Sequence, residues 1–268
     1  MIRQREHKKA QNRERILSRP IAHRGLYGDG IPENSMPAYA AAMQAGCSIE
    51  IDVQLTQDGV PVLFHDDNLL RMTGVKKRLT RLRHKDLRGL RLEGTEYGIP
   101  TLAEFLHFVG GAVPILVEIK RNRGSKGIER VVCDMLSGYD GSYAVQSFNP
   151  LAVRQVKKID PSIFCGLLSS KFEDLRLMFL KKEAVRNARL FFIAKPDFIS
   201  FEIGSFPNRR IASFRDELGL PVLGWTVQTK EDIERALKYC DNIIFENIEN
   251  LRKHMEEAGD FFGIARLT

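Results

Sequence analysis

Short segments rich in β-branched and aromatic residues recur along this chain, each followed by a stretch with helix-start residues. Nine such segments occur, at 20–25, 48–55, 60–66, 113–120, 143–148, 163–168, 197–203, 220–227 and 242–248. Strand and helix alternating eight times over about 250 residues is typical of a (β/α)8 TIM barrel rather than an open doubly wound sheet. No GxGxxG motif follows the first segment, which argues against a dinucleotide-binding fold.

Turn and capping residues predict where individual elements begin. The Asp58-Gly59 turn makes the segment at 60–66 an additional hairpin strand. Helix N-caps are predicted at Ser35, Thr101, Asn149 and Thr229, and the threonines form capping boxes with Glu104 and Asp232.

The composition is that of an ordinary globular protein. With 43% hydrophobic and 28% charged residues, the 268-residue chain is neither disordered nor fibrous. No apolar run approaches the roughly 18 residues of a membrane helix, and the first twenty residues lack the apolar core of a signal peptide. We therefore expect a cytoplasmic protein. Its four cysteines are scattered without a CxxC pair, so reduced thiols are expected.

The formal net charge of +7 is unevenly distributed. Residues 1–19 carry seven Lys or Arg against two Glu, and residues 66–100 carry nine against five, which leaves the remainder slightly acidic. We expect residues 1–19 to form a basic, solvated extension, either helical or frayed, and residues 20–268 to form one barrel, interrupted by an insertion at about 66–98. Nucleic-acid binding through these two segments is the less favoured alternative, because the body of the chain is not basic.

Three acidic residues are predicted to share the barrel interior. In 48–55, the period-two alternation places Glu50 and Asp52 opposite the aliphatic face, and Glu118 with Lys120 repeats the pattern in 113–120. Inward carboxylates are costly unless a cation neutralises them, and oxygen ligands suit a hard divalent ion such as Mg²⁺ or Ca²⁺. The alternative is a surface strand with solvated acids.

Two histidines follow apolar segments at predicted strand ends. His23 follows the apolar residues of the first segment and His65 follows those of the third, which places both at the barrel rim that carries catalytic residues in TIM-barrel enzymes. Two such histidines can divide general-base and general-acid duties, although a histidine at a strand end often serves only as a structural hydrogen-bonding group. Arg24 is suited to bidentate binding of a phosphate or a carboxylate, and Lys120 offers a point charge.

An ordered set of motifs resembles the glycerophosphodiester phosphodiesterase family. The motifs lie at 21–25 (IAHRG), 32–35 (PENS), 50–53 (EIDV), 64–67 (FHDD), 70–73 (LRMT), 99–102 (IPTL), 117–120 (VEIK), 146–148 (QSF) and 225–227 (WTV). The resemblance implies a TIM barrel with a small insertion after the second strand. It implies His23 and His65 as the acid–base pair and Glu50, Asp52 and Glu118 as the metal ligands. Its implied substrate-binding residues are Arg24, Glu33, Asn34, Lys120, Gln146 and Trp225.

The chain departs from the family pattern at two places. The family usually continues Trp-Thr-Val with Asn, where this chain has Gln228, and its last strand typically ends in Thr-Asp, where this chain has Phe245-Glu246-Asn247. Both departures are expected at the pocket mouth, where a rim hydrogen bond is relocated or lost.

The resemblance implies metal-dependent hydrolysis of a glycerophosphodiester, a small-molecule substrate, to glycerol 3-phosphate and an alcohol. It favours His23 as base and His65 as proton donor, and leaves water or a glycerol hydroxyl as the nucleophile. One alternative is lysophospholipase D-type activity on a larger glycerophospholipid. The other is a phosphate-binding barrel without catalysis.

Overall fold

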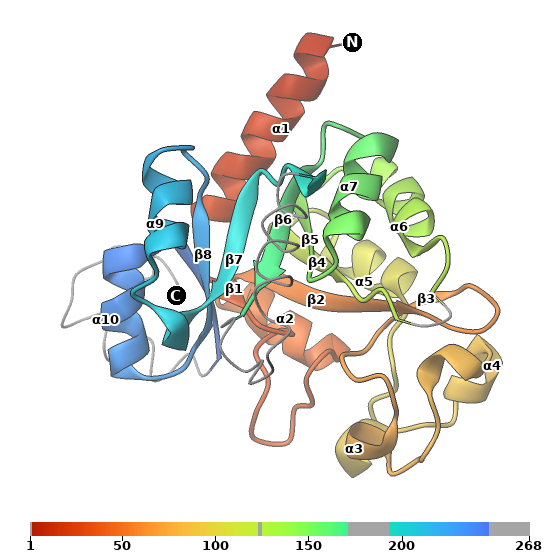
Figure 1. The fold of residues 1–268 in the computed structure, drawn as a ribbon. Coiled ribbons are helices and arrows are strands. Elements are labelled where there is room, and N and C mark those ends of the chain that lie inside the picture. The colour runs from red at the N-terminus through yellow and green to blue at the C-terminus, as the bar shows by residue number, and fades with distance from the viewer. Residues whose placement is uncertain (1, 123–124, 171–192, 247–268) are drawn as a thin grey trace, which may run out of the picture.

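The computed structural model describes residues 2–122, 125–170 and 193–246 (Figure 1). Each strand in these ranges coincides with one of the nine β-rich segments. The strands are β1 (Ile21–Ala22), β2 (Ser48–Leu55), β3 (Pro61–Leu63), β4 (Ile115–Ile119), β5 (Tyr143–Ser147), β6 (Phe164–Ser169), β7 (Phe198–Glu202), β8 (Val222–Val227) and β9 (Asn242–Phe245).

The strands form one closed barrel. The sheet order is β1-β9-β8-β7-β6-β5-β4-β2-β3, and β1 also pairs with β2, which closes the ring. All described pairings are parallel except that of β3, which runs antiparallel to β2 as the hairpin strand predicted after Asp58-Gly59. The predicted TIM barrel is therefore confirmed.

Helices alternate with these strands and begin at the predicted caps. Ser35, Thr101, Asn149 and Thr229 are the N-caps of α2, α5, α7 and α10, and the two threonines form the expected capping boxes. The barrel helices are α2 (Met36–Gln44), α5 (Leu102–Val109), α6 (Ile128–Ser137), α7 (Pro150–Ile159), α9 (Arg209–Asp216) and α10 (Lys230–Tyr239), with a 3₁₀ turn η3 (Ile203–Ser205). Among the described residues, none of the helices has the length and apolarity needed to span a bilayer.

The alternation within β2 sorts its side chains between two environments. Ile49, Ile51 and Val53 pack into the core between the sheet and the helices. Glu50 and Asp52 point the other way, into the barrel, and are almost completely buried. The same polarity holds in β4, so the apolar side of each strand supports the helices while the polar side builds the site.

The N-terminal segment is a helix that is packed against the barrel at two buried positions and is otherwise mostly exposed. It forms α1 (Ile2–Leu17), whose C-terminal half covers the amino end of the barrel. Ile16 is fully buried among the first residues of several strands, and Asn12 accepts a hydrogen bond from the backbone N–H of Tyr143 at 3.2 Å. Asn242 donates to the carbonyl of Ile16 at 2.7 Å. Only the first half of α1 projects from the barrel (Figure 1).

The insertion forms a small unit with its own apolar core at the opposite end of the molecule from the N-terminus (Figure 1). It contains α3 (Leu70–Thr73), η1 (Leu79–Arg81), α4 (His84–Leu87) and η2 (Leu92–Gly94). The apolar core of the unit packs against Val62 in β3 and Phe64 directly after it, and its members are Leu69, Met72, Leu79, Leu87 and Leu92. This packing fixes the unit to β3, which pairs with the carboxyl-terminal part of β2.

Candidate active site

Three buried carboxylates meet inside the barrel. Glu50 and Asp52 lie on β2 and Glu118 lies on β4, directly opposite Asp52 in the strand register. One oxygen of each lies within 4.8 Å of the others, and the residues are 1%, 0% and 6% exposed. The parallel register brings together acids that stand 66 positions apart in the sequence.

Burial and mutual repulsion dominate the electrostatics of this cluster. Burial, followed by the Asp52 and Glu118 charges, raises the pKa of Glu50 well above its ordinary value. Burial and Asp52 likewise raise the pKa of Glu118 to about 7, although Lys120 opposes the shift. Burial favours the neutral form of Asp52 too, but Lys120 and Arg24 outweigh it and lower its pKa. The three acids cannot all ionise here at low cost.

The cluster fits a divalent cation. Among the residues that the structure describes, buried Oε1 of Glu50 has no hydrogen-bond partner, and Asp52 Oδ1 has none beyond its ion pair with Lys120 at 3.0 Å. An unsatisfied buried carboxylate oxygen is costly, and a bound cation would remove both that cost and the repulsion. An all-oxygen donor set is the kind that hard divalent ions prefer.

Two cations border the acids. Lys120 Nζ lies 2.8 Å from Glu118 Oε1 and 3.0 Å from Asp52 Oδ1. Arg24 donates its backbone N–H to Glu50 at 3.0 Å, and its guanidinium lies 3.4 Å from Asp52. The backbone of Arg24 has φ +57°, a left-handed conformation that turns the chain at the end of β1.

Glu33 and Asn34 hold these groups from the loop before α2. Asn34 donates its amide to Asp52 Oδ2 at 2.9 Å and accepts from the Tyr39 hydroxyl at 3.0 Å, so Asp52 is held in one orientation. Glu33 accepts from Arg24 at 2.9 Å and also binds Arg71. In the structure, the Glu33 carboxylate therefore pairs with two arginines and does not join the acidic cluster.

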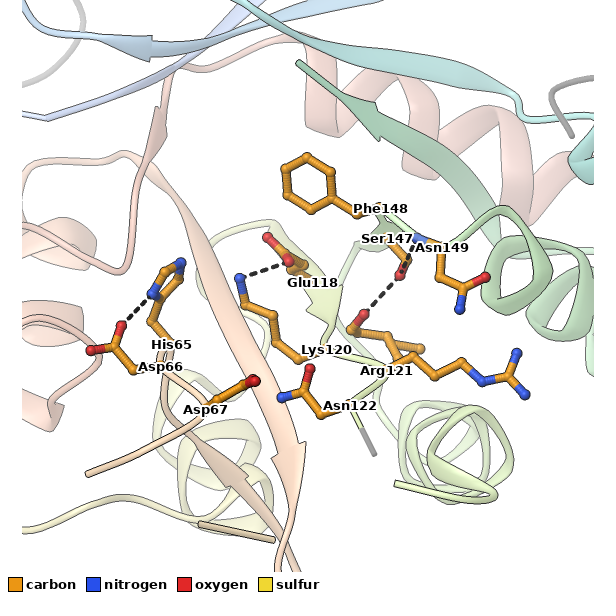
Figure 2. Close-up of a pocket in the computed structure, with 11 residues that line it drawn as sticks. His65, Asp66, Asp67, Glu118, Lys120, Arg121, Asn122, Ser147, Phe148 and Asn149 are labelled. Atoms are coloured by element: carbon orange, nitrogen blue, oxygen red, sulfur yellow. Dashed lines mark hydrogen bonds and ion pairs between the residues drawn. The ribbon is translucent and has the colours of Figure 1, made fainter. Parts of the chain in front are cut away.

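Both histidines are oriented by a carboxylate. His23 Nδ1 lies 2.6 Å from Glu246 Oε1, and His65 Nδ1 lies 2.7 Å from Asp66 Oδ1. Because a carboxylate only accepts, Nδ1 carries the proton in each ring and Nε2 is left for other chemistry. Burial, with Lys120 and Arg24, lowers the pKa of His65 despite the opposing charge of Asp52. Figure 2 shows His65 beside the Lys120–Glu118 pair.

The two departures from the family pattern contact each other. Gln228 donates its side-chain amide to Glu246, the partner of His23, and the Tyr27 hydroxyl also hydrogen-bonds to Glu246. Burial favours neutral Glu246, but the bonds from His23, Tyr27 and Gln228 lower its pKa to about 2. Gln228 therefore binds the carboxylate that orients His23. Asn247 lies outside the described residues.

Arg71 is a site residue that the sequence reasoning missed. Its guanidinium donates to both oxygens of Glu33, at 2.6 and 3.1 Å, and to both oxygens of Asp66, at 2.7 and 3.0 Å. Arg71 therefore links Asp66, which orients His65, to Glu33, which binds Arg24. The signal available was the position of Arg71 within the LRMT motif, five residues after Asp66.

A pocket of about 460 Å³ opens beside His65 and Glu118 (Figure 2). Its wall includes Phe148, which is 47% exposed and whose ring contacts Trp225 edge-on at 5.5 Å. Trp225 therefore contacts a residue of this wall. Gln146 is only 1% exposed, accepts from the Ser200 hydroxyl at 2.7 Å and does not line this pocket.

The chain is similar to proteins of known family. The model of the glycerophosphoryl diester phosphodiesterase family matches residues 23–250. A glycerophosphodiester phosphodiesterase of Caldanaerobacter subterraneus is 32% identical over 253 residues, 89% of this chain and 98% of that protein. A lysophospholipase D of Rattus norvegicus is 34% identical over 125 residues, 42% of this chain and 39% of that protein.

A solved structure extends the likeness to the fold. An Oleispira antarctica phosphodiesterase in complex with sn-glycerol-3-phosphate aligns with a TM-score of 0.73 and 24% identity, covering 89% of this chain and 95% of that one. The barrel and the acidic site define a family of phosphodiester hydrolases. The chain belongs to the glycerophosphoryl diester phosphodiesterase family.

Proposed function

We propose that this protein hydrolyses glycerophosphodiesters to glycerol 3-phosphate and an alcohol, with His23 and His65 as the acid–base pair. The observation that carries the proposal is that two carboxylate-oriented imidazoles accompany a buried three-carboxylate cluster. Both imidazoles lie close enough to Asp52 to help lower the pKa of its carboxyl. Such a cluster serves no packing purpose, because buried like charges are destabilising.

The histidines divide the proton transfers. Nε2 of His23 takes the proton of the attacking hydroxyl, while Glu246 stabilises the imidazolium that forms. Attack by water gives glycerol 3-phosphate directly, whereas attack by a neighbouring glycerol hydroxyl gives a cyclic phosphate that a water molecule then opens. As the bond from phosphorus to the departing oxygen breaks, Nε2 of protonated His65 supplies its proton. Asp66 holds that ring in place. The lowered pKa of His65 makes it a stronger acid than an ordinary imidazolium.

Glu50, Asp52 and Glu118 would hold a divalent cation, Mg²⁺ or Ca²⁺, next to the phosphate. When bound, such an ion supplies Lewis-acid stabilisation of charge on the phosphate oxygens. Arg24 and Lys120 present positive charge to the same region, and Asn34 keeps Asp52 oriented. The Trp225–Phe148 wall is proposed to contact the glycerol moiety.

The test is release of glycerol phosphate from glycerophosphocholine and glycerophosphoethanolamine, in Mg²⁺, in Ca²⁺ and in EDTA. We expect turnover that requires a divalent ion and is lost in His23→Ala. The matched control is His107→Ala, which alters an exposed histidine of α5 that is not among the proposed site residues. Undiminished turnover in EDTA would contradict the metal assignment, and an active His23→Ala variant would contradict the acid–base assignment.

A second candidate substrate is a lysophospholipid. The rat relative is named a lysophospholipase D, and the pocket is bordered by an exposed aromatic side chain, Phe148, that suits an apolar substituent. Lysophosphatidylcholine in the same assay distinguishes the two substrates. Failure of every substrate would favour a phosphate-binding barrel without catalysis.

A further inference from the structure

A strongly basic surface covers the insertion. Residues 74–91 contain eight cations and one acid, Asp86, and all nine side chains are exposed. The cations are Lys76, Lys77, Arg78, Arg81, Arg83, Lys85, Arg88 and Arg91. Four of them, Lys76, Lys77, Arg78 and Arg81, line a hollow of about 520 Å³ and form what we call the basic patch. Within the described part of the chain, none of these four forms an ion pair.

The basic patch lies next to the proposed active site. The backbone N–H of Leu69 donates to the Lys77 carbonyl at 2.9 Å, and that of Leu79 donates to the Asp67 carbonyl at 3.2 Å. Asp67 lines the pocket that holds His65. Residues 67–69, at the pocket rim, and residues 77–79, which belong to the patch segment, therefore pair side by side as a short antiparallel ribbon.

Exposed apolar side chains accompany this charge. Leu70, which begins α3 directly after the ribbon, is 48% exposed, and Phe148 at the pocket wall is 47% exposed. A surface that combines free cations with protruding apolar groups matches a lipid interface, where cations meet the headgroups and apolar groups enter the acyl boundary. A nucleic acid would satisfy the cations but would leave Leu70 in water.

We propose that the basic patch docks the protein on an anionic phospholipid surface, and so delivers the pocket to lipid-borne glycerophosphodiester headgroups. The substrate class rests on the proposed function, whereas the docking itself is measured without turnover. Each cation near an anionic surface increases binding by roughly fivefold, and the effect decays within a Debye length of about 8–10 Å.

The test is flotation of the full chain with vesicles of phosphatidylcholine alone or mixed with phosphatidylglycerol. The test variant reverses the patch by Lys76→Glu, Lys77→Glu, Arg78→Glu and Arg81→Glu. The control variant reverses four exposed arginines of α1, at the other end of the barrel, by Arg3→Glu, Arg5→Glu, Arg13→Glu and Arg15→Glu. Each reversal removes two charge units, so both variants change from +7 to −1.

We expect binding to the anionic vesicles only, weakened roughly a hundredfold or more by the patch reversal and much less by the α1 reversal. Turnover of soluble glycerophosphocholine stays unchanged in both variants, which shows that the barrel and the proposed site are intact. Equal losses in the two variants, equal binding to neutral vesicles, or tighter binding to duplex DNA than to anionic vesicles would each overturn the proposal. Vesicle binding without any hydrolysis would instead count against the proposed function.

Discussion

His23 and Glu246 stand 223 positions apart in the chain, and their side chains meet at 2.6 Å. The first and last strands of the closed barrel are neighbours, so β1 and β9 deliver both residues to the same rim. The backbone N–H of His23 also donates to the Phe245 carbonyl at 3.0 Å. The closure of the barrel therefore determines the orientation of the proposed base.

Replacing the partner of His23 should affect turnover more than substrate binding. In Glu246→Gln, an amide can still accept from Nδ1 but no longer supplies the negative charge that stabilises the imidazolium. We expect kcat to fall by roughly 10²-fold or more while KM changes only a few-fold. Steady-state kinetics with glycerophosphocholine test this, with Glu234→Gln on the exposed side of α10 as the control. A variant that changes only KM would disprove the orienting role.

The acidic cluster should lower the stability of the cation-free protein. Glu50→Gln removes one of three buried carboxylates, so we expect its Tm in EDTA to rise by a few degrees, on the order of 1 kcal/mol. Mg²⁺ or Ca²⁺ should stabilise the wild type and have little effect on the variant, because the ligand is lost. Thermal unfolding with and without the ion checks both statements. A variant that the ion stabilises as strongly as wild type would refute the ligand assignment.

The same cluster predicts a pH dependence. The pKa of Glu118 is raised to about 7 in the folded protein, so the folded state retains a proton that the unfolded chain releases above pH 4.5. The contribution of Glu118 to cation-free stability should therefore be greatest below about pH 4.5 and decrease, by roughly 1–3 kcal/mol, as pH rises towards 7.

Urea unfolding in EDTA at several pH values measures this dependence, and Glu118→Gln should flatten it. The charged groups that face the Glu118 carboxylate are Lys120, Arg24 and Asp52. The control is Asp86→Asn, which removes one exposed acid of the insertion and leaves these groups in place. A variant with the unchanged wild-type slope would assign the effect to another group.

Arg71 should matter although it is 45% exposed in its side chain. It bridges Glu33 and Asp66 with four hydrogen bonds, so Arg71→Ala releases the partner of His65 and the partner of Arg24 together. We expect kcat to fall by about tenfold with stability changed by less than about 1 kcal/mol. Arg71→Lys should not restore the rate, since an ammonium cannot form both bidentate pairs. Kinetics of Arg71→Ala beside Arg78→Ala test this; equal rates would contradict it.

The stability of the barrel should depend on the packing of α1 against its amino end. Ile16 is fully buried among residues of several strands, so Ile16→Ala should cost about 2–5 kcal/mol of unfolding free energy. Arg13→Ala, exposed on the same helix, should cost less than about 0.5 kcal/mol. Equilibrium urea unfolding measures both. If both variants lost similarly little unfolding free energy, α1 would not contribute to the stability of the barrel.

Local patterns in the sequence were sufficient for much of the fold. Nine β-rich segments, four helix caps and the Asp58-Gly59 turn depend on backbone preferences and period-two alternation, which act between near neighbours. The same alternation placed Glu50, Asp52 and Glu118 on the interior side. In α1, however, the buried positions Asn12 and Ile16 are too few to reveal a packed face among so many charged residues.

Only the tertiary structure decided which elements distant along the chain contact each other. The sequence by itself determined which side chains enter the barrel and which two histidines end strands, because both follow from local periodicity. Barrel closure decided that Glu246 orients His23, and the docking of the insertion decided that Arg71 links Asp66 to Glu33. A hydrogen bond depends on side-chain positions to within a few tenths of an ångström, and those positions exist only once β1, β9 and the insertion have packed around the same rim.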